Sequence, residues 1–274
     1  MWIRILLATG SAVVALGLSA FWLEPASLAL VEERISLPGT THGSLRIAVL
    51  TDLHVGSPFN GIEKLRKVVD RTNAARPDVV CILGDLVIQG VIGGRFVTPE
   101  DTAAELKRLR APAGVVAVLG NHDSWLNHDR VRTAVERNGI RVLEETAAKL
   151  GTPAGPVWFA GVSDLWTGRP DIPTALATVD DGAPVILMTH NPDVFPVVPS
   201  RVALTLAGHT HGGQVRLPFF GRPIVPSTFG QRYAAGHIIE DGRHLFVATG
   251  VGTSILPVRF RVPPAVTLLT VVFE

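Results

Sequence analysis

Hydrophobic residues form an uncharged run near the N-terminus of the chain. Nineteen residues from Ile5 to Leu23 carry no charge, and Arg4 and Glu24 stand at the two ends. A helix rises about 1.5 Å per residue, so this run is long enough to cross a bilayer. Tryptophans near both ends suit the two membrane interfaces. We therefore predict a retained, single-pass membrane helix.

A cleavable signal peptide is the alternative interpretation of this run. Ser27 and Ala29 form a tolerable small-residue cleavage site. The run is longer than the usual apolar region of a signal peptide, which has about 7 to 15 residues. One arginine precedes the run and acidic residues follow it, so the positive-inside rule weakly places the folded part outside the cytoplasm.

Downstream of residue 45, short apolar runs alternate with amphipathic stretches, a pattern typical of an α/β domain. The hydrophobic positions of residues 62–72 recur at helical spacing, and Pro77 ends this first predicted helix. Thr98 is placed to cap a second helix, and a third helix is expected over 127–138. We predict an anchor and linker over 1–34 and one catalytic domain over 35–274. Strands are expected at 45–51, 78–83, 115–119, 157–162, 184–189, 202–207, 244–249 and 266–273.

Composition and charge exclude several classes of protein. The chain has 274 residues, of which 47% are hydrophobic and 18% charged, so a disordered protein is excluded. Twenty-five Lys and Arg balance twenty-four Asp and Glu, so nucleic acid is not an expected partner. The single cysteine, Cys81, excludes an intrachain disulfide and is expected in the core.

Polar residues recur directly after the predicted strands. Because ligands bind outside the carboxyl ends of strands in α/β sheets, we expect these segments to converge on one site. The segments are Asp52-Leu53-His54, Gly84-Asp85, Gly120-Asn121-His122-Asp123, Thr189-His190-Asn191 and Gly208-His209-Thr210-His211.

The types of these side chains point to metal ions. Each segment alone could be a helix cap or a turn. Three carboxylates, one amide and five imidazoles packed together would carry a large desolvation cost, which cations would remove. Oxygen and nitrogen ligands without thiolate suit Mn²⁺, Fe or Zn²⁺. The number of ligands indicates two divalent ions bridged by a carboxylate, of which manganese is the first choice.

These segments resemble the calcineurin-like metallophosphoesterases. That superfamily has the blocks D-x-H, G-D, G-N-H-D/E, H and G-H-x-H, and residues 45–250 contain all five in order. The resemblance implies two β-sheets packed as a sandwich and flanked by helices. It also implies a role for each matching residue: Asp52, His54 and His211 would hold one metal, Asn121, His190 and His209 the other, Asp85 would bridge them, His122 would act on the phosphoryl group, and Asp123 would orient His122.

Departures from the pattern narrow the resemblance. Ser/Thr protein phosphatases continue the second block as D-R-G, whereas Leu86 follows Asp85 here. The run from Gly208 to Pro218 and the N-terminal span are similar to the membrane-associated bacterial branch, which includes UDP-2,3-diacylglucosamine hydrolases of lipid A biosynthesis. The resemblance therefore implies the plasma (inner) membrane, with the side of the catalytic domain open.

Substrate contacts are expected between Gln214 and Tyr233, where arginines stand among aromatic residues and prolines. Arginines would bind phosphate oxygens and apolar residues would bind acyl chains, although the segment could equally be a proline-ordered surface loop. Trp125 and Trp166 could be core or contact residues. The candidate contacts are Arg216, Phe220, Arg222 and Arg232.

Together these features predict a hydrolase of a phosphodiester or pyrophosphate bond in a phosphorylated substrate. We expect an acylated substrate such as UDP-2,3-diacylglucosamine. One alternative is a secreted or anchored general phosphodiesterase that acts on nucleotides or other small phosphodiesters. A non-catalytic binding module is a minor alternative, because none of the seven predicted ligands is substituted.

Overall fold

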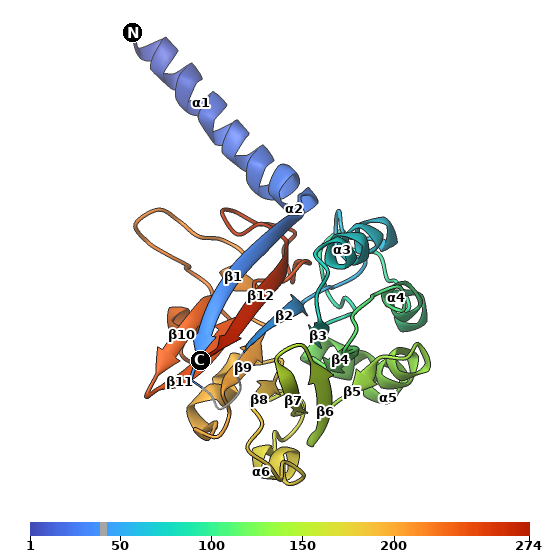
Figure 1. Ribbon diagram of the computed structural model, residues 1–274. Coiled ribbons are helices and arrows are strands. Elements are labelled where there is room, and N and C mark those ends of the chain that lie inside the picture. The colour runs from blue at the N-terminus through green and yellow to red at the C-terminus, as the bar shows by residue number, and fades with distance from the viewer. Residues whose placement is uncertain (39–42) are drawn as a thin grey trace.

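Two six-stranded sheets form the body of the protein, with helices on the outside (Figure 1). The computed structural model describes residues 1–38 and 43–274, so His42 lies outside the described residues. This architecture confirms the predicted fold class of two packed sheets flanked by helices.

Each sheet is mostly parallel with antiparallel pairs near its edges. The first sheet consists, in spatial order, of β1 (Ala29–Leu37), β12 (Ala265–Phe273), β2 (Gly43–Leu50), β3 (Val79–Leu83), β4 (Val115–Val118) and β5 (Arg141–Val142). The second sheet consists of β10 (Gly236–Glu240), β11 (Arg243–Val247), β9 (Leu204–Ala207), β8 (Val185–Met188), β7 (Gly155–Gly161) and β6 (Thr146–Thr152). In the first sheet β2, β3, β4 and β5 are parallel, and in the second β7, β8, β9 and β11 are parallel.

Alternate residues of the central strands enter different cores. In β3, Cys81 and Leu83 point into the core between the sheets, whereas Val80 and Ile82 pack against the outer helices. In β8, Met188 faces the core between the sheets and its neighbour Leu187 faces outward. Strands covered on both faces read as continuous apolar runs, which is why the sequence located them.

The helices cover the outer faces of the sheets. The helices α3 (Ile62–Ala74), α4 (Pro99–Leu106) and α5 (Asn121–Arg137) pack on the first sheet. The helices α6 (Ile172–Leu176) and η2 (Pro192–Val197) pack on the second. Thr98 caps α4 by accepting a hydrogen bond from the backbone N–H of Asp101. The helix α5 consists of two helical segments separated by a kink at Asn127, and the second segment begins where the third helix was predicted.

Four strands were not predicted, and each has a weak apolar pattern. The strand β1 carries exposed charges on an edge and pairs in parallel with β12, so residues 29–34 belong to a strand where we expected linker. The strand β5 has only two residues, and β6 is rich in Ala, Thr and Gly. The strand β10 joins β11 through Asp241-Gly242, and both residues have positive φ. An Asp-Gly pair is a common turn of a β-hairpin, so this dipeptide is the sequence signal for β10.

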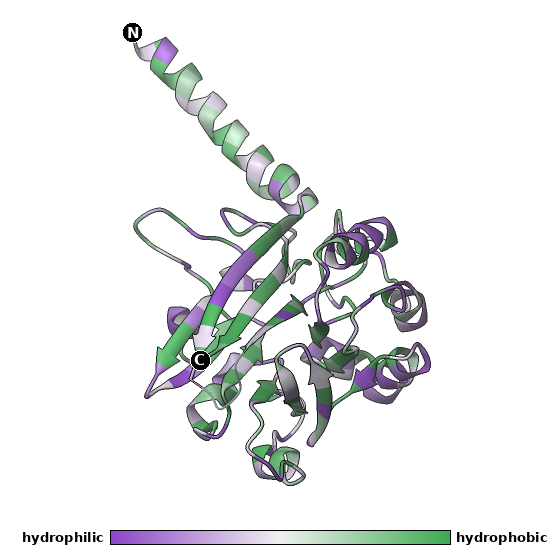
Figure 2. Cartoon of the chain, viewed as in Figure 1, coloured by the Kyte–Doolittle hydropathy of each residue, from purple (hydrophilic) through white to green (hydrophobic). Residues whose placement is uncertain are grey.

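The N-terminal residues form one helix that projects from the domain (Figures 1 and 2). It comprises α1 (Trp2–Leu18), a π-helical turn η1 (Ser19–Leu23) and α2 (Glu24–Ala26). Only 6% of its apolar stretch is buried, so it is not a core helix. Its length and composition fit either a membrane span or a signal sequence.

The C-terminal end of this helix is hydrogen-bonded to the loop between β11 and β12. The carbonyl of Ala20 accepts a hydrogen bond from the backbone N–H of Arg259 at 2.9 Å. The carboxylate of Glu24 accepts bonds from the N–H groups of Arg261 (2.8 Å) and Val262 (2.5 Å). The helix end is therefore held against the domain.

The strand β1 gives a stability prediction for a chain shortened to begin at Ser27. Ile35→Ala should lower the free energy of unfolding by about 2–5 kcal/mol, because Ile35 is 1% exposed in the core between the sheets. Glu33→Ala, at an exposed position of the same strand, should change it by less than about 0.5 kcal/mol. Urea unfolding measures both values, and equal effects would contradict the assignment of β1 to the core.

Candidate metal centre

Loops at the carboxyl ends of five parallel strands bring the predicted ligands together. Asp52 and His54 follow β2, Asp85 follows β3, and Asn121 follows β4 in the first sheet. From the second sheet, His190 follows β8, and His209 and His211 follow β9. Their exposed fractions range from 0 to 4%, so bulk water solvates these polar groups poorly.

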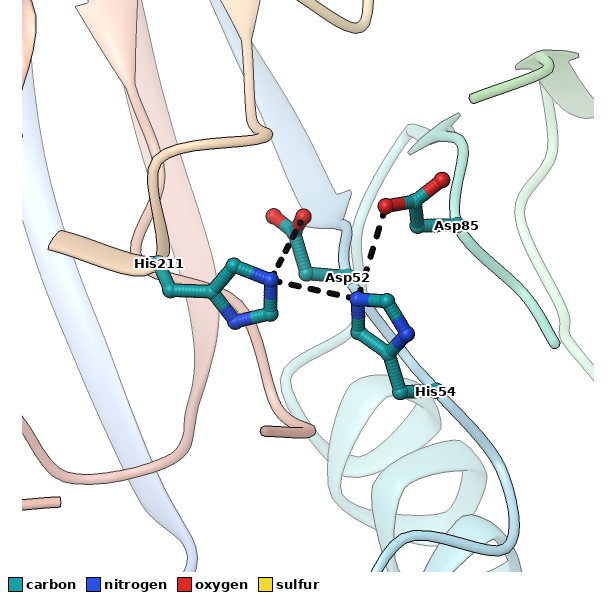
Figure 3. A group of neighbouring side chains, drawn as sticks. All are labelled: Asp52, His54, Asp85 and His211. Carbon is teal, nitrogen blue, oxygen red and sulfur yellow. Dashed lines mark hydrogen bonds and ion pairs between the residues drawn. The ribbon is translucent and has the colours of Figure 1, made fainter. Parts of the chain in front are cut away.

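One group consists of Asp52, His54, Asp85 and His211 (Figure 3). The Nε2 atoms of His54 and His211 are 3.1 Å apart. His54 Nε2 lies 3.4 Å from Asp85 Oδ2, and His211 Nε2 lies 3.4 Å from Asp52 Oδ1. Four donor atoms from three loops therefore face one point.

A second group consists of Asp85, His190 and His209. His190 Nε2 lies 3.3 Å from Asp85 Oδ2 and 3.2 Å from His209 Nδ1. The side-chain oxygen of Asn121 is 3.2 Å from the same His190 atom. Asp85 is thus the carboxylate that both groups share, which agrees with the bridging role that the sequence predicts for it.

The donor spacing fits coordination of divalent cations. Ligand bonds of about 2.1 Å place neighbouring donors about 3.0–3.4 Å apart in octahedral or tetrahedral geometry, and the pairs above lie between 3.1 and 3.4 Å. Asp52 Oδ1, one of these donor atoms, is buried without a hydrogen-bond partner among the described residues. Two facing imidazole nitrogens share at most one proton when neutral, so a cation between them satisfies both.

Electrostatics inside the cluster point the same way. Burial lowers the pKa of His54 and of His209 to about 3, so both imidazoles are neutral, as metal ligands must be. Burial also raises the pKa of Asp52 to about 7. For His190, burial opposes protonation, but the neighbouring Asp85 carboxylate raises its pKa to about 10. In the absence of metal, His190 supplies the positive charge that Asp85 needs.

The loops that carry the ligands have an unusual backbone. Five of the seven predicted ligands have positive φ, which costs about 1–3 kcal/mol for each residue and is frequent at functional sites. They are Asp52, His54, Asp85, His209 and His211.

The glycines of the motifs allow these loops to pack closely. A Cβ atom on Gly208 would collide with the hydroxyl of Thr51, and one on Gly120 would collide with the Asp85 carboxylate. The glycines of the G-D, G-N-H-D and G-H-x-H blocks are therefore needed where one ligand loop contacts the next.

Comparison with known proteins agrees with this geometry. The family model of the calcineurin-like phosphoesterases matches residues 45–213, which contain every predicted ligand. The chain belongs to this family. The chain is therefore a metal-dependent phosphoesterase of the hydrolase class, with residues suited to divalent ions.

Relatives of this phosphoesterase match almost its whole length. The metallophosphoesterase YkuE of Bacillus subtilis is 31% identical over 92% of this chain and 88% of its own. The phosphodiesterase YaeI of Escherichia coli is 29% identical over 92% of this chain and 91% of its own. The NAD nucleotidase of Haemophilus influenzae shares the fold, with a TM-score of 0.51 and 14% identity over 77% of this chain and 46% of that chain.

The two predicted catalytic residues of the phosphoesterase lie in different surroundings. His122 lines the cavity above the metal site, with its ring centroid 4.7 Å from that of His54. No hydrogen bond joins Asp123 to His122, because His122 Nδ1 has no hydrogen-bond partner among the described residues. The Asp123 carboxylate accepts bonds from the N–H groups of Asp85, Leu86, Val87 and Gly120, at 2.8 to 3.3 Å. It holds the backbone of the Asp85 loop.

A cavity of about 550 Å³ lies over the metal site. Beyond the ligands its walls include Trp125 and Trp166, about half exposed, together with Ile224 and Ile255. The ring centroids of Trp166 and His209 are 4.2 Å apart. Both tryptophans are thus available to a substrate.

The predicted substrate contacts do not form the wall of this cavity. Arg216 lines a separate shallow pocket of about 380 Å³. Phe220 is 78% exposed, and Arg222 is half-buried. Arg232 is paired with Glu240 at 2.5 Å. None of the four is among the described residues that line the large cavity.

Several residues that shape the site were not singled out in the sequence. Asp164 Oδ2 accepts bonds from the backbone N–H groups of Trp166 and Thr167 and so positions Trp166. Gly250 and Gly252 pack against Asp52 and His54, where a Cβ atom would collide. Like the predicted ligands, these residues follow strands, here β7 and β11, which is the signal that could have identified them.

The histidines outside the five motif blocks, and the single cysteine, have other surroundings. His128 bonds to Glu144 at 2.8 Å, and His237 bonds to His244 at 3.0 Å, both near the surface. Cys81 is fully buried in β3, where burial raises its pKa, as expected for a core residue.

Substitutions at Asp85 and His122 should separate metal binding from turnover. Asp85→Ala should lose both ions, because both donor groups share this carboxylate. His122→Ala should keep its metal and lose about 10²–10⁴ in turnover of an artificial phosphodiester. Elemental analysis of the purified proteins measures the metal. Full occupancy in Asp85→Ala would contradict the bridging position.

Asp123→Asn tests the structural role of this carboxylate. It should lower the free energy of unfolding of the metal-free protein by about 1–3 kcal/mol, because an amide oxygen cannot replace both carboxylate oxygens toward four N–H donors. Asp129→Asn, an exposed position of the same helix, is the matched control. Lower turnover with unchanged urea unfolding would instead favour orientation of His122.

Proposed function

We propose that this chain is an anchored, two-metal phosphodiesterase that hydrolyses a phosphodiester or pyrophosphate bond in an amphiphilic substrate. The observation that carries the proposal is the pair of donor groups sharing Asp85 beneath a cavity with half-exposed aromatic walls. Manganese is the proposed metal, because Mg²⁺ seldom accepts a set of ligands so rich in imidazole.

The residues around the metal site would divide the work. When bound, two divalent ions supply positive charge that polarises the phosphoryl group and lowers the pKa of a water molecule. His122 would donate a hydrogen bond to a phosphoryl oxygen or to the leaving oxygen from the cavity wall. The Trp125 and Trp166 side chains would exclude water and hold the leaving group.

The cavity wall offers apolar contact rather than charge. Among the described residues that line it, none is a lysine or arginine. The metal ions would therefore neutralise the phosphate or pyrophosphate, and the wall would contact the group attached to it. A pocket with Trp166, Ile224 and Ile255 fits a substrate whose phosphate is attached to an apolar group.

An acylated substrate such as UDP-2,3-diacylglucosamine agrees with these walls and with the N-terminal helix. Each buried acyl CH₂ contributes about 0.8 kcal/mol, and the proposed span of Trp2–Ala26 would hold the enzyme at the plasma membrane beside such lipids. Arginines of the 214–233 segment do not support this substrate, because they are not among the described residues that line the cavity. The proposal of an acylated substrate therefore depends on the apolar wall of the cavity instead of on these arginines.

The test compares UDP-2,3-diacylglucosamine with its deacylated counterpart, using purified protein loaded with Mn²⁺. The diacyl substrate should be hydrolysed at least about tenfold faster, since each acyl chain adds apolar contact. Chelated protein should be inactive on both, which controls for the metal. Equal rates would eliminate the lipid substrate and leave a general metal-dependent phosphodiesterase.

A further inference from the structure

The loop between β11 and β12 extends from the cavity to the C-terminal end of the N-terminal helix. Within this loop, Ser254 and Ile255 line the cavity. A few residues later, Arg259 bonds through its backbone to Ala20, and Arg261 bonds through its backbone to Glu24. The cavity mouth and the end of the proposed span are therefore connected by a short, bonded stretch of chain.

The buried guanidinium of Arg259 holds this loop in place. It is 0% exposed and donates hydrogen bonds to the carbonyls of Thr249, Gly252 and Val262. Three carbonyls on both sides of the loop are thereby fixed to one side chain. The loop cannot shift freely relative to the metal site, because Gly252 packs on His54.

A second loop is attached to the first by backbone hydrogen bonds. The N–H of Arg216 bonds to the carbonyl of Phe260 at 2.9 Å, and the N–H of Phe260 bonds to the carbonyl of Gln214 at 2.9 Å. In Figure 1 the orange loop after Gln214 and the red loop before β12 both lie on the side from which the helix leaves the domain. We call these two segments, residues 214–226 and 254–262, the paired loops.

The paired loops expose large apolar side chains. Phe219 is fully exposed, and Phe220, Ile224 and Ile255 are each at least 70% exposed. Exposed apolar groups of this size mark contact with a membrane or with another protein. We choose the membrane, because the 254–262 loop is hydrogen-bonded to the end of the helix that would enter it, and the 214–226 loop is hydrogen-bonded to the 254–262 loop.

Positive charge accompanies these apolar groups. Arg216, Arg261 and Phe219 line the same shallow pocket of about 380 Å³. Arginines beside aromatic residues suit a lipid interface, where the charge meets anionic headgroups and the ring enters the acyl boundary.

We propose that the paired loops lie in the bilayer surface, with Phe219 and Ile224 among the lipids and Arg216 and Arg261 on anionic phospholipid headgroups. This inference rests on the membrane anchoring in the proposed function. It places the cavity mouth, where Ile224 and Ile255 stand, at the membrane surface. A lipid substrate could then reach the metal site without leaving the bilayer completely.

Site-specific labelling of the full-length chain tests the position of the loops. Cys81 is fully buried, so a cysteine introduced as Phe219→Cys can be labelled selectively with an environment-sensitive fluorophore. In vesicles of phosphatidylcholine and phosphatidylglycerol, the 219 label should shift to the blue and be quenched by spin-labelled lipid acyl chains. Ile239→Cys, exposed on β10, is the matched control and should show neither effect. The same spectrum at both positions would overturn the proposal.

A second measurement tests the charge. With Arg261→Ala in the Phe219→Cys background, quenching should fall at least twofold in the anionic vesicles. Quenching that is independent both of Arg261 and of phosphatidylglycerol would overturn the headgroup contact.

Activity separates this inference from the proposed function. Phe219→Asp should reduce hydrolysis of the acylated substrate in vesicles at least tenfold and leave hydrolysis of a soluble artificial diester unchanged. An unquenched 219 label on an enzyme that prefers the acylated substrate would defeat the inference alone. A quenched label on an enzyme with no preference for acyl chains would support the loop position and defeat the lipid substrate.

Discussion

The carboxylate of Asp85 lies between imidazoles from both sheets and is 1% exposed, so bulk water solvates its charge poorly. An isolated buried carboxylate is costly, so the structure must supply positive charge around it. His190 does so in the absence of metal, and cations do so when they bind. The same histidine donates from Nδ1 to the carbonyl of Leu83 at 2.6 Å and so ties β8 to the end of β3. The same side chain therefore compensates the charge of Asp85 and joins the two sheets.

This arrangement has a cost in the backbone. Ligands such as His54 and His209 sit at positive φ, and the motif glycines remove side chains where the loops meet. Such strain persists only when the surroundings hold the loops rigidly. The parallel strands provide that rigidity, since β3 and β8 are packed on both faces and end directly in the ligand loops. Asp123 adds to it by fixing the backbone of the Asp85 loop.

The metal site is also connected outward to the N-terminal helix. Gly252 packs on the ligand His54, Arg259 bonds to Gly252, and the backbone of Arg259 bonds to Ala20. The loop that contains Gly252 and Arg259 thus contacts both a ligand and the N-terminal helix. It helps to fix the ligand position and the orientation of the domain relative to the helix. This continuity explains why an arginine is fully buried there: its five N–H groups can hold several carbonyls at once.

The sequence by itself determined the central strands and the residues that gather as candidate metal ligands. The runs around Cys81 and Met188 are apolar throughout because both faces of their strands are covered, and the ligands follow directly where these strands end. Local pattern did not reveal β1, because its exposed glutamates hide the two positions that pack inward. Only the tertiary structure decided that Asp123 holds a backbone loop and that Arg216 lies outside the cavity, while Trp166 and Ile255 form its wall. The reason is physical: a strand and its end are short-range features, whereas a cavity wall forms from loops whose positions depend on contacts between residues distant in the chain.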